Sequence, residues 1–163
     1  AFLNAGMWLD EAHRYATKYS GCSKVQVGSV IVVGNGLFVV YGANRSIPDL
    51  CKTRGCLRVE KYGEDSKNHR LPSDCRAIHS ELDAITKLAQ IPFGLHQSYT
   101  DETVLYVTRY PCEACARAIV SAGIKTVIYG RQQTISEETQ RIFDSGKVAC
   151  YHCSEWDAED RNY

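Results

Sequence analysis

The chain has 163 residues, of which 44% are hydrophobic and 23% are charged, a balance that suits one compact domain of ordinary core size. Basic and acidic side chains number 19 each, so no net charge favours non-specific binding to nucleic acid. No apolar run approaches the roughly 20 residues that span a bilayer, and the N-terminus shows no secretory signal. We therefore expect a single domain over residues 1–163 in the cytoplasm, with neither a membrane nor a nucleic-acid partner.

The first part of the chain predicts one helix and a β-hairpin. Residues Met7–Tyr19 place apolar side chains at intervals of three and four, as an amphipathic helix does. The run Val25–Val33 is rich in β-branched residues, and the turn sequence Gly34-Asn35-Gly36 separates it from a second apolar run, Leu37–Tyr41. Two such runs around a glycine-containing turn are typical of a hairpin.

The segment Asn44–Cys75 has a different character. It is polar, has almost no apolar periodicity, and contains three cysteines and one histidine. We expect it to lack regular structure. A loop of about 30 residues is uncommon inside a compact domain unless something fixes it, and its cysteines and histidine suggest a metal ion.

After this segment, helices and strands alternate. An apolar helical face begins at His79, and the expected strands are Thr103–Thr108, Lys125–Tyr129 and Lys147–Tyr151. Two further helices are expected at Cys112–Ala122, with Gly123 as its cap, and at Ser136–Ser145. This alternation predicts a mixed α/β sheet covered by helices.

Two motifs carry chemistry. The first is His79-Ser80-Glu81, and the second, starting 31 residues after His79, is Tyr110-Pro111-Cys112-Glu113-Ala114-Cys115. Two thiolates and one imidazole are typical zinc ligands, and three protein ligands leave a fourth position for water. Because Cys112 and Cys115 are three residues apart at a predicted helix start, both sulfurs can point the same way, and the helix dipole favours the thiolate. We expect a catalytic zinc ion on His79, Cys112 and Cys115.

The neighbouring carboxylate points to the reaction. Zinc lowers the pKa of bound water towards about 7, and the resulting hydroxide can attack an aromatic carbon that bears an amino group. Glu81, two residues after His79, is placed to move protons from the water to the ring and to the leaving ammonia. The combination H-x-E…P-C-x-x-C is the signature of zinc deaminases. A Cys-x-x-Cys alone would also fit a structural zinc site or a redox pair, neither of which needs Glu81.

These residues also support a resemblance. Over roughly Trp8–Tyr129 the chain resembles the cytidine and deoxycytidylate deaminase family, and within it the deoxycytidylate (dCMP) deaminases most. The likeness rests on the stretches Val27–Val32, Gly42–Asn44, Gly55–Arg58, Cys75–Ile85 and Leu105–Thr108, and on the motif at Pro111. The resemblance implies a three-layer α/β/α cytidine-deaminase-like fold, with a mixed five-stranded sheet and helices on both faces. It further implies zinc on the three residues above, Glu81 as proton shuttle, and a homo-oligomer, with a hexamer as one option.

The resemblance implies a small nucleotide substrate, dCMP, converted to dUMP and ammonia. Asn44 matches the family asparagine that contacts the sugar, but the family pattern Gly-Tyr-Asn-Gly is Gly42-Ala43-Asn44-Arg45 here, and Asp83 stands where asparagine is common. Another cytosine, guanine or modified nucleoside or nucleotide is therefore an alternative substrate, and an RNA-modifying or RNA-binding module is an alternative function. The expected substrate contacts are Asn44, Arg45, Thr108 and Arg109, with Lys52 and Arg54 as further candidates for a phosphate.

A second, structural zinc ion is expected beside the first. A closed four-ligand site would contribute folding free energy to a segment with few apolar residues, and the resemblance extends to phage and bacterial dCMP deaminases that carry such an ion. The expected ligands are Cys22, Cys51, His69 and Cys75, with Cys56 as the alternative to Cys22. Free cysteines that pack as small apolar side chains would explain the same residues. Cys150 and Cys153 have no partner pair, so we interpret them as ordinary packing.

Overall fold

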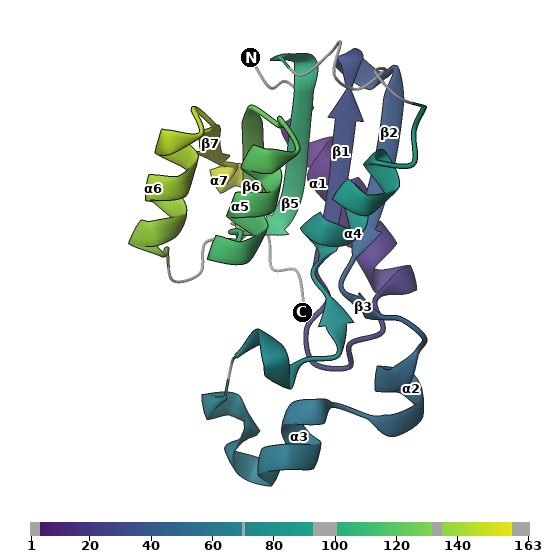
Figure 1. The fold of residues 1–163 in the computed structure, drawn as a ribbon. Coiled ribbons are helices and arrows are strands. Elements are labelled where there is room, and N and C mark those ends of the chain that lie inside the picture. Colours follow the sequence, from purple (N-terminus) through teal and green to yellow (C-terminus); the bar gives the residue numbers. More distant parts are fainter. Residues whose placement is uncertain (1–3, 70, 93–100, 132–134, 158–163) are drawn as a thin grey trace.

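A computed structural model describes residues 4–69, 71–92, 101–131 and 135–157 of the chain (Figure 1). Five strands form one sheet in the order β2-β1-β5-β6-β7. β1 pairs antiparallel with β2 and β5, whereas β5, β6 and β7 run parallel to one another. The mixed five-stranded sheet is therefore confirmed. Its strands are β1 (Gly28–Val33), β2 (Phe38–Ala43), β5 (Thr103–Arg109), β6 (Thr126–Arg131) and β7 (Ala149–His152).

Helices cover both faces of the sheet, which confirms the three-layer arrangement (Figure 1). Side chains alternate along the strands, so Ile31 of β1 belongs to one core and Val30 and Val32 to the other. The first core packs against α4 (Ser80–Leu88), α5 (Glu113–Ser121) and α6 (Glu137–Ser145), and the second against α1 (Ala5–Tyr19) and α7 (Ser154–Asp157). None of the helices in the described ranges has the length and apolar composition needed to cross a membrane.

Two predicted boundaries shift for local reasons. The first strand begins at Gly28 and not at Val25, because the Asn44 side chain binds the backbone of Val25 and Val27 in place of a strand partner. The helix predicted from Cys112 begins one residue later, with Cys112 as its N-cap. Gly123, with φ 79°, follows that helix and donates its amide to the Val120 carbonyl, as expected of a helix end.

The expectation that residues 44–75 lack regular structure is wrong. The segment contains two short helices, two 3-10 turns and one strand of a two-stranded ladder. These elements are β3 (Arg45–Ser46), paired with β4 (Ala77–Ile78), α2 (Leu50–Arg54), α3 (Leu57–Tyr62), and the turns Gly63–Asn68 and Pro72–Asp74. Polar contacts hold them, such as the 2.9 Å ion pair between Lys61 and Asp74 and the 3.0 Å hydrogen bond from Arg76 to the Gly55 carbonyl. Because no apolar stripe supports these helices, hydrophobic periodicity could not reveal them.

Candidate metal centre

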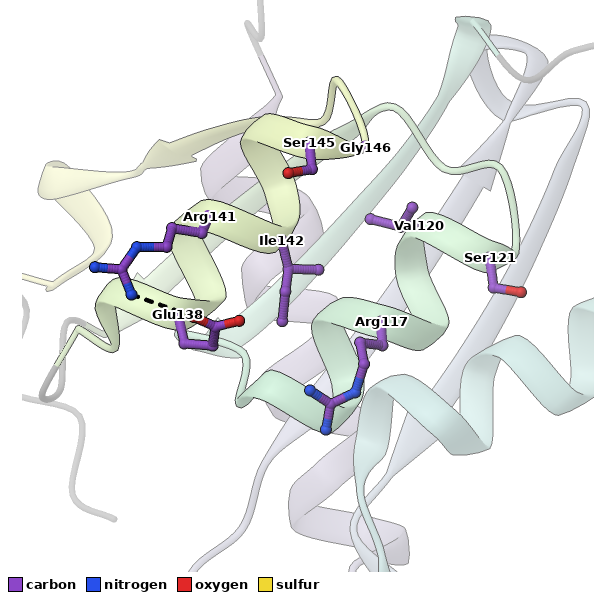
Figure 2. A pocket seen from close by; sticks show the side chains of 8 residues that line it. All are labelled: Arg117, Val120, Ser121, Glu138, Arg141, Ile142, Ser145 and Gly146. Atoms are coloured by element: carbon purple, nitrogen blue, oxygen red, sulfur yellow. Dashed lines mark hydrogen bonds and ion pairs between the residues drawn. The ribbon is translucent and has the colours of Figure 1, made fainter.

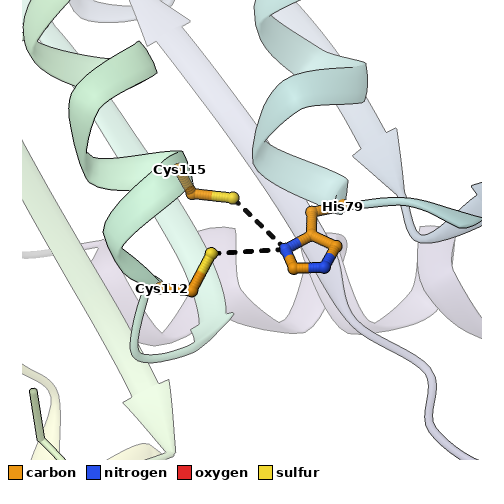
Figure 3. Close-up of side chains that lie close together, drawn as sticks. All are labelled: His79, Cys112 and Cys115. Carbon is orange, nitrogen blue, oxygen red and sulfur yellow. Dashed lines mark hydrogen bonds between the residues drawn. The ribbon is translucent and has the colours of Figure 1, made fainter. Parts of the chain in front are cut away.

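Two neighbouring helices bring three ligand-type side chains together (Figure 3). His79 is the N-cap of α4, Cys112 is the N-cap of α5, and Cys115 lies in the first turn of α5. The Nδ1 atom of His79 is 3.5 Å from Sγ of Cys112 and 3.4 Å from Sγ of Cys115. Both helices pack on the same face of the sheet, and this packing brings the N-terminus of α4, with His79, close to the N-terminus of α5, with Cys112 and Cys115.

The spacing of these atoms fits zinc. With Zn–S of about 2.3 Å, Zn–N of about 2.05 Å and a tetrahedral angle, nitrogen and sulfur ligands lie about 3.6 Å apart. The two Nδ1–Sγ distances in the protein are 3.4 and 3.5 Å. Among the residues that the structure describes, no other three histidine, cysteine or acidic side chains bring their ligand atoms within 4.8 Å of one another.

Hydrogen bonds among the three side chains shift their pKa values in different directions. A hydrogen bond with Cys115, and a further one with His79, lower the pKa of the Cys112 thiol to about 4. The same bond to Cys112, together with burial, raises the pKa of Cys115, and the hydrogen bond with Cys112 raises the pKa of His79. The lowered pKa of Cys112 favours its thiolate, the form that binds a metal ion, and a metal ion would displace the protons of the other two ligands.

Glu81 lies beside this group in the first turn of α4, with only 5% of its surface exposed. Burial raises the pKa of its carboxyl group above the ordinary value. The hydroxyl of Ser80 donates to Oε2 of Glu81 at 3.1 Å, and the same hydroxyl lies 2.7 Å from that of Ser29 on β1. A buried carboxyl with a raised pKa, in a fixed orientation, is suited to accept and return a proton.

Asn44, the expected sugar contact, lies between the end of β2 and the chain that leads into β1. Its Oδ1 atom accepts hydrogen bonds from the Val27 amide at 2.8 Å and from the Ser20 hydroxyl at 2.7 Å. Its Nδ2 atom donates to the Val25 carbonyl at 2.8 Å. Within the part of the chain that the structure describes, the second amide hydrogen of Nδ2 has no protein acceptor, so it is the atom that a ligand could use.

The other expected substrate residues differ in accessibility. Thr108 is fully buried, and its hydroxyl accepts the Gly28 amide at 3.1 Å, so it joins β5 to the start of β1. Arg109 is half-buried at the end of β5, three residues before Cys112. Lys52 and Arg54 lie exposed on α2. Thr108 and Arg109 thus lie four and three residues before Cys112, and Asn44 follows Ala43, whose amide binds Asp83 of α4, whereas Lys52 and Arg54 belong to the polar segment.

The residues expected to bind a second zinc ion are not assembled in the same way. The imidazole of His69 stacks on Tyr62 at 3.6 Å between ring centroids, and its Nε2 atom lies 2.9 Å from the carboxylate of Asp65. The four cysteines concerned are all half-buried free thiols: Cys22, Cys51, Cys56 and Cys75. All five residues lie in the described ranges, and no three of them bring their ligand atoms within 4.8 Å of one another.

A family model described as the cytidine and deoxycytidylate deaminase zinc-binding region matches residues 4–131, which include both motifs and the whole metal centre. The chain belongs to this family. The resemblance inferred from the sequence is thereby confirmed.

Two relatives and one solved structure extend the comparison. ComE operon protein 2 of Bacillus subtilis (strain 168) is 31% identical over 143 residues, which are 86% of this chain and 66% of the relative. The deoxycytidylate deaminase of Homo sapiens is 32% identical over 106 residues, 64% of this chain and 52% of the relative. This chain therefore spans less than two thirds of the length of these proteins. A dCMP deaminase from the cyanophage S-TIM5, solved in complex with dCMP and dUMP, shares the fold with a TM-score of 0.64. The two sequences are 19% identical, and the match covers 90% of this chain and 93% of that chain.

A hollow of about 400 Å³ lies between α5 and α6 (Figure 2). Val120 and Ile142 form its apolar floor, with Arg117 and Arg141 at its rim, where Arg141 pairs with Glu138 at 3.2 Å. None of the residues of the metal centre lines it. This hollow is therefore separate from the candidate active site.

Sequence reasoning missed one contact beside the metal centre and one ion pair further along α4. Ser29 contacts Ser80 across 51 residues of sequence, and no local pattern signals such a contact. Lys87 lies four residues after Asp83, and their 3.1 Å ion pair has the helical i, i+4 spacing that could have indicated it.

Proposed function

We propose that the protein hydrolyses the amino group of dCMP to give dUMP and ammonia, with zinc as its cofactor. The observation that carries the proposal is a buried carboxylate, Glu81, beside a histidine–cysteine–cysteine group with tetrahedral spacing. Zinc bound at such a group acts as a Lewis acid and makes a hydroxide nucleophile available at neutral pH. Membership of the deaminase family and the similarity to a deoxycytidylate deaminase and a dCMP deaminase support the same reaction.

The side chains of this protein have distinct roles in the proposed reaction. His79, Cys112 and Cys115 would hold the zinc ion. Glu81 would take one proton from water and deliver it to the ring nitrogen next to the amino-bearing carbon, and would then move the second proton of that water from the new hydroxyl group to the amino group, which leaves as ammonia. Ser80 keeps the Glu81 carboxylate in place by its 3.1 Å hydrogen bond. Water supplies the oxygen of the product, and the cytosine amino group leaves as ammonia.

Substrate recognition completes the proposal. Asn44 would offer its remaining amide hydrogen to the sugar, and Arg109 would meet the phosphate, since a planar guanidinium suits that group. Thr108, whose hydroxyl is occupied by Gly28, would contribute through its backbone at the end of β5. Arg45 is also expected near the bound nucleotide, where its guanidinium forms an ion pair with Asp83.

A substrate panel tests the proposal. Zinc-loaded protein is given dCMP, cytidine, dCTP and guanine, and ammonia release is measured for each. We expect the highest kcat/KM for dCMP. A clear preference for guanine, for cytidine or for another nucleotide would favour the alternative substrate class. Ammonia release from none of them, together with RNA binding that weakens steeply with salt, would favour an RNA-directed module instead.

We include a second, structural zinc ion in the proposal, on Cys51, His69 and Cys75 with Cys22 or Cys56. Its support is the concentration of ligand-type residues in a segment with few apolar side chains. Elemental analysis is expected to find about two zinc ions per chain, and about one in Cys75→Ser with turnover retained. One zinc ion per wild-type chain would contradict this part.

A homo-oligomer, with a hexamer as one option, also belongs to the proposal, and light scattering of the purified protein tests it.

A further inference from the structure

One buried carboxylate, that of Asp83, binds two cations. Its side chain is 2% exposed, and its Oδ1 atom lies 3.1 Å from Nη2 of Arg45. Its Oδ2 atom lies 3.1 Å from Nζ of Lys87 and accepts the Ala43 amide at 3.1 Å. Burial acts to raise the pKa of Asp83, but the hydrogen bonds from Arg45, Ala43 and Lys87 hold it below the ordinary value. The group is therefore an anion at neutral pH.

Arg45 and Asp83 form a charged pair. The two positions are 38 residues apart in sequence, and their side chains form three donor–acceptor contacts of 3.1 to 3.3 Å. The guanidinium and the carboxylate are therefore joined by more than a single hydrogen bond.

The position of this pair connects two parts of the candidate active site. Asp83 binds Ala43 and Arg45, the residues before and after Asn44. Asp83 also lies two residues after Glu81 on the same helix, α4. The carboxylate therefore ties the backbone on both sides of Asn44 to the helix that carries the proton shuttle, and it makes no contact with the Asn44 side chain, whose partners are Ser20, Val25 and Val27.

The second cation, Lys87, makes its contacts elsewhere. Its ammonium group donates to the Tyr41 carbonyl at 2.8 Å and to the Tyr15 hydroxyl at 2.9 Å, and it lies 5.1 Å from the centre of the Tyr15 ring. These contacts join α4 to the middle of β2 and to α1. Lys87 neutralises Asp83 without touching Asn44 or its two neighbours, so the two cations on one carboxylate have different effects.

We propose that Arg45 is a positioning residue for the nucleotide: by binding Asp83, its guanidinium fixes Asn44 at a set place relative to Glu81. This inference rests on the function proposed above and deepens its account of substrate binding. Two of the three guanidinium nitrogens, Nε and Nη2, are engaged by Asp83. Arg45 therefore acts on the sugar contact through Asn44, and its effect does not require a phosphate on the substrate.

Two matched variants test this, because each removes one cation from the same carboxylate and leaves the other in place. Arg45→Met is expected to raise KM about tenfold for both dCMP and deoxycytidine, with kcat changed by less than about twofold, as loss of a charge-assisted hydrogen bond would. Lys87→Met is expected to change KM by less than about twofold. In an Asp83→Asn background, Arg45→Met should raise KM by less than about threefold, since the neutral amide needs no cation.

Three outcomes would overturn the inference. The first is an equal change in KM in Arg45→Met and Lys87→Met. The second is an increase in KM for dCMP but not for deoxycytidine. The third is an increase in KM from Arg45→Met that is as large in the Asp83→Asn background as in wild type.

Hydrogen exchange gives a readout that does not depend on turnover. The amides of residues 43–45 are expected to exchange faster in Arg45→Met than in wild type or Lys87→Met, and unchanged exchange would also overturn the inference. If no substrate were turned over, the proposed function would fail while hydrogen exchange still decided the role of Arg45.

Discussion

Replacing Glu81 with glutamine is expected to lower kcat for dCMP by about 10³-fold, because an amide can neither take the proton from water nor return it. The protein should keep its zinc, since Glu81 is not among the three residues that would hold it. Glutamine has the same shape, so the buried site should keep its packing, and the Ser80 hydroxyl can still donate to the side-chain oxygen. Turnover and zinc content are measured on the same sample.

Glu113→Gln is the matched control for this change. Glu113 also lies in the first turn of a helix, directly after Cys112, but it is exposed and binds the Ser136 hydroxyl at 2.8 Å. Its replacement is expected to leave kcat within about twofold of wild type, as for a surface substitution. A loss of turnover as large as that of Glu81→Gln, or a loss of zinc from Glu81→Gln, would refute the assignment of Glu81 as proton shuttle.

Replacing Cys112 with serine is expected to abolish measurable turnover and to remove about one zinc ion per chain, because a serine hydroxyl does not ionise near neutral pH as this thiol does. The melting temperature should also fall, since zinc bound to the folded state contributes to its stability. Elemental analysis, thermal unfolding and dCMP turnover are compared between the variant and wild type.

Cys153→Ser tests whether the effect belongs to Cys112 or to any cysteine. Cys153 is another free cysteine, half-buried after β7 and outside both sets of expected ligands. It should retain wild-type zinc content and turnover. Full zinc content and turnover in Cys112→Ser would instead show that the metal is bound elsewhere.

Local sequence patterns account for the parts of the structure that were predicted correctly. The β-branched run before Gly34 indicated β1, and the spacing of Cys112 and Cys115 indicated a helix start with both sulfurs on one side. Each pattern is read within a few residues, so it does not depend on the rest of the fold. The family resemblance then supplied the number of strands and the second helical layer.

The features that escaped prediction depend on contacts between distant residues. The helices α2 and α3 lack an apolar stripe, and contacts such as that between Lys61 and Asp74 hold their surroundings. The pair of Arg45 and Asp83 forms because the end of β2 packs against α4, where an added Cβ on Gly42 would meet the Ser80 carbonyl. Such close approaches follow from the assembled sheet and could not be deduced from either segment alone.

Hydrolysis of dCMP by the zinc-loaded protein in water enriched in oxygen-18, with mass spectrometry of the nucleotide product, tests the central claim most directly. The proposed reaction predicts dUMP that carries one oxygen-18 atom on the uracil ring, with ammonia released in equal amount and no product after zinc is removed. Absence of dUMP, dUMP without the label, or turnover that persists without zinc would contradict it.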